Sequence, residues 1–239
     1  MYSNKKMARI AGVLYVIIIA AGIFAEFFVR QSLIAPGDAA ATAGNIAAAE
    51  PLFRLGIAAD LVMILADVAL ALLFYILLKP VSQPLSLLAA FFRLGQAAIL
   101  AVNLLNLFVG LQLVTGAATV TALGAAQAQA LGLLFLGMHG VGYTIGLVLF
   151  AASILLVGYL VFKSSDFPAI LGVLLVVAAA GYFIDGFARV LLPNYGDIET
   201  ILTLIVFLPA FIGELSFAVW LLVKGVKTPR PQLRPSHAF

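Results

Sequence analysis

The sequence contains no cysteine and only two histidines. The absence of cysteine excludes disulfides, thiolate nucleophiles, iron–sulfur clusters and cysteine zinc sites. Only His139 lies in an apolar segment, so a bis-histidine haem within one chain is excluded as well. Neither an HExxH motif nor a paired-histidine spacing is present. We therefore expect no metal and no cofactor.

Charge is also scarce: only 10% of the 239 residues are charged, 64% are apolar, and the mean hydropathy is +1.20. Such a chain has too little polar surface to cover a soluble globule, so we expect it to lie in a lipid bilayer. The net charge of +3 does not indicate a nucleic-acid partner, because the basic residues are few and flank apolar runs.

Six apolar runs are long enough to cross a bilayer, which takes about 20 residues. They lie near residues 10–30, 52–79, 85–113, 140–162, 168–190 and 201–223. The predicted fold is therefore all-α, a polytopic bundle of six transmembrane helices in one domain, residues 1–226. The remaining residues, 227–239, are basic and rich in proline, and we expect a disordered cytoplasmic tail.

The basic residues that flank the predicted spans are divided unequally between the two sides. One side carries Lys5, Lys6, Arg9, Lys79, Lys163, Lys224, Lys227, Arg230 and Arg234, whereas the other carries Arg30, Arg54 and Arg189. By the positive-inside rule, both termini are cytoplasmic. Spans two, four and six also end with the same spacing of an aromatic residue, a lysine and a proline. This spacing indicates either helix-hairpin repeats or a shared way of leaving the membrane.

Two segments outside or beside the spans are less regular. Residues 125–163 are too long for one ordinary span and too short for two, so we expect an outer or re-entrant helix that bends at His139–Gly140 before the fourth span. Between the first two spans, a surface helix is expected to begin after the cap Asp38 and to end at Pro51.

One phrase occurs twice: GIFAEFFVR at residues 22–30 returns as GYFIDGFAR at residues 181–189. Each copy places an acid four residues before an arginine, on one helix face, and each is followed at the same offset by Gly-Asp. The repeat suggests that spans one and two are equivalent to spans five and six. The acid and arginine are either an ion pair that fixes helix depth, or part of an outer polar cavity lined by Glu26 and Asp185.

Polar residues at membrane depth form two groups, and charged groups there normally face protein or a wet cavity. Near the middle, the candidates for ligand binding are Asp67, Arg93, Glu214, Gln96, Asn103 and Asn106. The outer polar cluster consists of Glu26, Arg30, Asp60, His139, Tyr143, Asp185 and Arg189. Arg93 has two candidate partners, Asp67 and Glu214. Pro209 is expected to kink span six beside Glu214, as in the broken helices of transporters.

Several motifs occur together in one order: GIFAEFFVR, PGDAAATAGNI, FRLGIAADL, FFRLGQAAILAVNLLNL, HGVGYTIGLV and LPAFIGELS. In these motifs the chain resembles a bacterial membrane family, domain of unknown function 4386, over roughly residues 7–226. The resemblance implies a multi-pass protein of the bacterial inner membrane. It implies no activity, because the family brings no known substrate or catalytic residue.

Three functions fit these patterns. The first is binding or transport of a small solute or ion by the buried acids and arginine. The second is an intramembrane enzyme that acts on a lipid-like substrate through His139 and nearby carboxylates. The third is a structural or sensory partner protein, whose buried charges only fix helix register. A homo-oligomer is compatible with all three, and whether the protein is an enzyme stays open.

Overall fold

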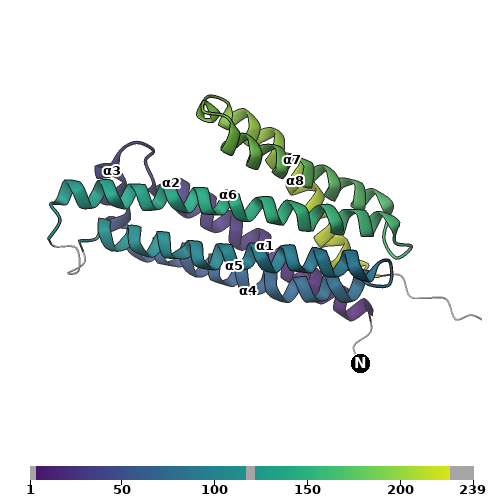
Figure 1. The fold of residues 1–239 in the computed structure, drawn as a ribbon. Helices are drawn as coiled ribbons and strands as arrows, with labels where there is room; N and C mark the ends of the chain where they lie inside the picture. Colours follow the sequence, from purple (N-terminus) through teal and green to yellow (C-terminus); the bar gives the residue numbers. More distant parts are fainter. Residues whose placement is uncertain (1–3, 117–121, 227–239) are drawn as a thin grey trace, which may run out of the picture.

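The computed structural model describes residues 4–116 and 122–226, except for the side chain of Thr203. These residues form helices and no strands (Figure 1). In chain order the elements are α1 (Asn4–Ile23), the π-helix η1 (Phe24–Arg30), α2 (Gln31–Leu33), α3 (Ala39–Ala48), α4 (Glu50–Leu78), α5 (Gln83–Val114), α6 (Ala125–Lys163), α7 (Ala169–Leu191) and α8 (Tyr195–Val223). The predicted tail, residues 227–239, lies outside the described residues.

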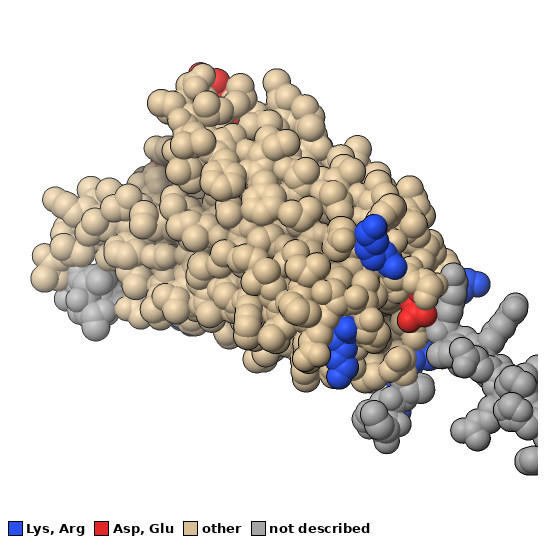
Figure 2. Space-filling model, turned by 45° about the vertical axis from the view of Figure 1, so that its right-hand side comes forward, with Lys and Arg blue, Asp and Glu red and all other residues tan. Residues whose placement is uncertain are grey.

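Six helical segments of the described chain are long and apolar enough to cross a membrane. They are α1 with η1 and α2, then α4, α5, α6, α7 and α8. Large apolar side chains such as Leu65, Val102 and Leu204 are 66–70% exposed, which a soluble surface rarely tolerates. Figure 2 shows a face with almost no charged side chains, while Lys and Arg gather toward one end. The predicted all-α polytopic membrane fold is confirmed.

The six spans close into a ring. Each long helix packs on its neighbour in sequence from α4 to α8, and α1 packs against both α4 and α8. The ring is closed by α1, which packs between α4, the second span, and α8, the last span. Its interior is therefore bordered by all six spans, and any space there is shared among segments far apart in the sequence.

Glycines allow close helix approaches near the basic end of the ring. A Cβ on Gly12 would lie 2.6 Å from the backbone nitrogen of Leu222, so α1 and α8 touch through their backbones. Likewise, a Cβ on Gly158 would lie 2.9 Å from the carbonyl oxygen of Gly172, where α6 crosses α7. Larger residues would push these helices apart. The helices near the basic end of the bundle are thus in direct backbone contact at these two places.

The beginning of α1 and the end of α8 share this end, to the right in Figure 1. The side chain of Lys5 lies beside Gly225. This contact brings the beginning of α1 against the chain that follows α8. Lys79 and Lys163, at the ends of α4 and α6, each lie over the tyrosine four residues earlier, at 5.7 and 5.8 Å from the ring centroids. These contacts match the aromatic and lysine spacing seen in the sequence.

Helix α6 differs from the prediction, because it continues without a bend through His139–Gly140. Its 39 residues span about 58 Å, far more than the roughly 30 Å of a hydrocarbon core. The additional turns pack on the 32-residue α5, where Gly132 faces Val114, and on α3. The expected re-entrant helix is therefore replaced by a straight hairpin that is longer than the membrane is thick.

The surface helix between the first two spans is confirmed at its beginning and corrected at its end. Asp38 caps α3 by accepting a hydrogen bond from the backbone nitrogen of Ala41 at 2.9 Å. However, α3 ends at Ala48, and Pro51 lies in the first turn of α4. Proline is well suited to that position, since the first helical residues need no hydrogen-bond donor.

Candidate functional site

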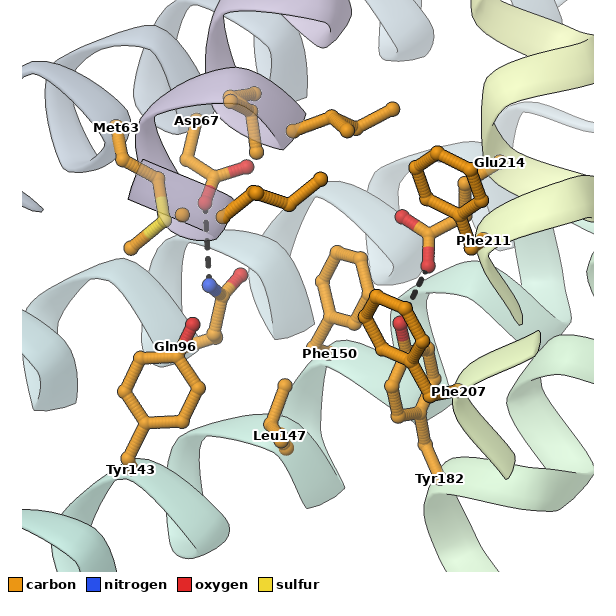
Figure 3. Close-up of a pocket in the computed structure, with 14 residues that line it drawn as sticks. Met63, Asp67, Gln96, Tyr143, Leu147, Phe150, Tyr182, Phe207, Phe211 and Glu214 are labelled. Carbon is orange, nitrogen blue, oxygen red and sulfur yellow. Dashed lines mark hydrogen bonds between the residues drawn. The ribbon is translucent and has the colours of Figure 1, made fainter. Parts of the chain in front are cut away.

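A pocket of about 130 Å³ lies inside the ring, and all six spans contribute to its wall. We call it the inner pocket. It is lined by Ile18, Ile19, Gly22, Ile23, Met63, Asp67, Gln96, Tyr143, Leu147, Phe150, Tyr182, Phe207, Phe211 and Glu214. Figure 3 shows Asp67 and Gln96 on one side, Glu214 and Tyr182 on the other, and Leu147 and Phe150 between them. Most of the wall is apolar or aromatic, and the polar groups face one another across it.

Asp67 on α4 is paired with two residues of α5. Arg93 donates from Nε to Asp67 Oδ1 at 2.8 Å, and its Nη2 lies 2.6 Å from the same oxygen. Gln96 donates from Nε2 to the other oxygen, Oδ2, at 3.1 Å. Asp67 and Arg93 are each only 1% exposed. The predicted hairpin pair is therefore present, and the charge of Asp67 is matched by one buried cation.

The guanidinium of Arg93 is enclosed by aromatic rings. Its carbon Cζ lies 5.0 Å from the ring centre of Phe150, 5.4 Å from that of Tyr15 and 5.6 Å from that of Phe74. Nη1 has no hydrogen-bond partner in the described part of the chain. The rings supply the electrostatic stabilisation that water would otherwise give this group. Arg93 thus supports Asp67 from behind and does not itself line the pocket.

Glu214 on α8 has a different environment. It accepts hydrogen bonds from the hydroxyl of Tyr15 at 2.9 Å and from the hydroxyl of Tyr182 at 2.7 Å. It is 6% exposed, and no ion pair joins it to a cation within the described residues. Of its two candidate partners, Arg93 therefore forms its ion pair with Asp67. Glu214 is left as a buried carboxyl held by two neutral donors.

Arg30 organises the first half of the outer polar cluster. It donates from Nε to Glu26 at 2.8 Å and from Nη1 to Asp60 on α4 at 2.6 Å. The first copy of the repeated phrase forms the π-helix η1 here, in which the backbone nitrogen of Gln31 bonds to the carbonyl oxygen of Glu26. Arg30 and Asp60 are buried, whereas the side chain of Glu26 is 44% exposed. The predicted Glu26–Arg30 ion pair is present and extends to Asp60.

The second copy of the phrase is a regular α-helix with different partners. Arg189 Nε lies 3.6 Å from Asp185, and Arg189 Nη2 donates to Glu199 on α8 at 2.7 Å. Asp185 also accepts a hydrogen bond from the hydroxyl of Tyr195 at 2.6 Å. The two copies therefore share the acid and arginine spacing but differ in helix type and in the third residue of the network. Equivalence of the two helix pairs stays a prediction.

Two further pockets, beside the outer polar cluster, share lining residues with the inner pocket. The outer pocket, about 400 Å³, is lined by Glu26, Arg30, His139, Tyr143, Asp185, Arg189 and Glu199, among others. The side pocket, about 310 Å³, includes Glu26, Asp185, Arg189, Tyr182 and Phe207. Tyr143 and Leu147 line all three pockets. Glu26 and Asp185 thus line the same two pockets, and Tyr143 lies between the outer polar cluster and the inner pocket.

The remaining candidates lie at the edge of this arrangement or away from it. His139 is 4% exposed, lines the outer pocket and packs its ring against Tyr143 at 6.0 Å between centroids. Asn103 donates to the backbone carbonyl of His139 at 2.8 Å and accepts from Asn106. Both asparagines line a separate shallow depression on the outside of the ring. Within residues 4–116 and 122–226, no group of three His, Cys, Asp or Glu residues could hold a metal ion.

Sequence reasoning missed three tyrosines and one acid of the site: Tyr15, Tyr182, Tyr195 and Glu199. Tyr15 and Tyr182 stand in apolar segments, where a tyrosine hydroxyl needs a hydrogen-bond partner once buried. That requirement was a usable signal, since few acceptors exist at this depth. Glu199 gave no such signal, because it follows a loop and resembles an ordinary charge at a helix beginning.

Comparison with known proteins gives one family and one relative. Residues 10–225 match the family described as "Domain of unknown function (DUF4386)". An "Uncharacterized protein" of Archaeoglobus fulgidus is 32% identical over 165 residues, which cover 69% of this chain and 80% of that protein. No solved structure matches the chain. The family match over residues 10–225 includes every residue that lines the inner pocket.

Proposed function

Because this chain belongs to the DUF4386 family, whose description names no activity, we propose its function from the geometry of the site. The protein is an integral membrane protein that binds a small solute or ion in the inner pocket and carries it across the bilayer. It lies in the bacterial plasma membrane with both termini in the cytoplasm, which the basic residues at the end that holds the beginning of α1 and the end of α8 support.

The observation that carries this proposal is the composition of the pocket wall. All six spans contribute to it, and two buried acids on different spans border it. A purely structural charge would be paired locally with an opposite charge, as Glu50 is with Arg54 at the surface. Glu214 instead borders open space without a cation. Buried ionisable residues of this kind in membrane proteins mark substrate or ion pathways.

The path from outside to this pocket is supported by the two larger pockets. Both contain Glu26 and Asp185, and both share Tyr143 and Leu147 with the inner pocket. At the opposite end, the backbone contacts of Gly12 and Gly158 close the ring. The arrangement corresponds to a site that faces outward and is shut toward the cytoplasm. Transport requires a second arrangement, in which the same site faces inward.

Cysteine labelling tests the proposal directly, because the chain has no cysteine of its own. Leu147→Cys places a thiol where the three pockets meet, and Phe211→Cys places one in the inner pocket. Leu65→Cys, on the lipid-facing side of α4, is the control. A charged, membrane-impermeant thiol reagent is added to vesicles of either orientation.

We expect both pocket thiols to react from the outer side and the control thiol to stay unreacted. A transporter also requires that the Phe211→Cys thiol react from the cytoplasmic side. Reaction from the outer side alone would contradict transport and leave a solute-binding protein. If neither pocket thiol reacted from either side, the pockets would be closed to water and the whole proposal would fail.

A further inference from the structure

We propose that the ligand of the inner pocket is a small protonated amine whose ammonium group pairs with Glu214. This inference rests on the proposed function and names the chemical class of its solute. It follows from four properties of the pocket: its charge, its free acceptors, its aromatic wall and its size.

The charge of the buried groups is unequal. Asp67 and Arg93 form a matched pair, whereas Glu214 receives only the hydroxyl donors of Tyr15 and Tyr182. A carboxylate in the membrane interior costs several kcal/mol unless a positive charge accompanies it. Because no ion pair joins Glu214 to a second cation among the described residues, a cationic ligand would complete the charge balance of this site.

The pocket also has an unused hydrogen-bond acceptor. Gln96 is 4% exposed and lines the pocket, and its Nε2 is used by Asp67. Its Oε1 is buried and has no partner among the described residues. A buried acceptor without a donor is costly, which indicates that a donor arrives with the ligand. An alkylammonium group carries three N–H donors, whereas an alcohol carries one and a carboxylate none.

Aromatic rings form much of the remaining wall. Tyr143, Phe150, Tyr182, Phe207 and Phe211 all line the pocket, and they come from α6, α7 and α8. The faces of such rings attract cations and tolerate an alkyl chain. An inorganic cation such as Ca²⁺ or Mg²⁺ would bind weakly in this pocket, because such ions prefer six or more oxygen ligands. The wall therefore favours an organic cation over a metal ion.

The size of the pocket limits the amine. At about 130 Å³, the pocket is slightly smaller than an apolar cavity of about 150 Å³ that accommodates benzene. A ligand of about six non-hydrogen atoms is therefore the upper bound for a snug fit. n-Butylammonium has the appropriate size, and n-butanol and butyrate are its neutral and anionic counterparts.

The outer cluster supports a cationic ligand as well. Four acids, Glu26, Asp60, Asp185 and Glu199, accompany only two arginines, Arg30 and Arg189. The acids are in excess where the outer and side pockets open. An excess of negative charge at an entrance raises the local concentration of cations and disfavours anions.

The experiment measures binding of n-butylammonium, n-butanol and butyrate to the purified protein by calorimetry. We expect n-butylammonium to bind in preference to the other two. Glu214→Gln, which keeps the shape of the side chain, should weaken its binding by at least about tenfold. Glu50→Gln, which removes an exposed acid outside the pocket, should leave it unchanged. Tyr182→Phe removes one hydroxyl donor but keeps the carboxyl, so this variant should still bind the amine.

Equal binding of n-butanol and n-butylammonium, insensitive to Glu214→Gln, would overturn the amine inference and leave the solute pocket standing. The absence of any n-butylammonium binding would overturn it too. The labelling of the Leu147→Cys thiol decides the proposed function separately. If the Glu214→Gln variant did not fold, the Tyr182→Phe variant would provide the test. This variant keeps the Glu214 carboxyl, so loss of n-butylammonium binding in the folded Tyr182→Phe protein would contradict the inference.

Discussion

Replacing Arg93 by methionine should destabilise the protein strongly. The variant would leave Asp67, 1% exposed, with Gln96 as its single hydrogen-bond donor in place of a cation at 2.6 Å. Removing one partner of a buried ion pair typically costs about 3–5 kcal/mol. For a chain of this length, that corresponds to a fall in melting temperature of roughly 6–20 °C. The measurement is thermal unfolding in detergent, monitored by helical circular dichroism.

A double-mutant cycle separates the charge from the shape of the side chain. Arg93→Met combined with Asp67→Leu removes both charges, and apolar replacement of a buried pair is often neutral. We therefore expect the double variant to recover most of the stability lost by Arg93→Met. Arg54→Met, which breaks an exposed pair with Glu50, should cost no more than about 1 kcal/mol. A double variant as unstable as Arg93→Met alone would refute the electrostatic reasoning.

Two further predictions concern packing and the outer cluster. Gly158→Leu should lower the melting temperature, because the leucine side chain would collide with the backbone of α7 at Gly172. An unchanged melting temperature would show that α6 and α7 can separate at no cost. Asp60→Asn should cost about 1–3 kcal/mol, since the buried Arg30 would keep only Glu26 as an ionised partner; denaturant unfolding measures this, and no change would mean that Glu26 alone suffices.

Local chemistry explains what the sequence could predict. The six spans follow from the length of the apolar runs, and the pairing of Glu26 with Arg30 follows from their spacing on one helix. The pairing of Asp67 with Arg93 follows from the short hairpin between α4 and α5. In each case the partners are close in the chain or are joined by a tight turn.

Contacts between distant spans could not be predicted in the same way. Whether Arg93 reaches Asp67 or Glu214 depends on where α8 sits in the ring, and the sequence does not state this. The bend expected at His139 was wrong for a related reason. Helix α6 stays straight because α5 and α3 cover its additional turns, and neither partner is visible from the composition of the segment itself.

The hydrogen bond between Tyr15 and Glu214 has a consequence for biosynthesis. It joins the first span to the last, across 199 positions of the chain. When α1 enters the membrane, the acceptor of its tyrosine hydroxyl has not yet been synthesised. The ring can close only after α8 has been inserted beside α1. The inner pocket is therefore complete only after α8 has been inserted, and a chain translated without α8 lacks the part of the wall formed by Phe207, Phe211 and Glu214.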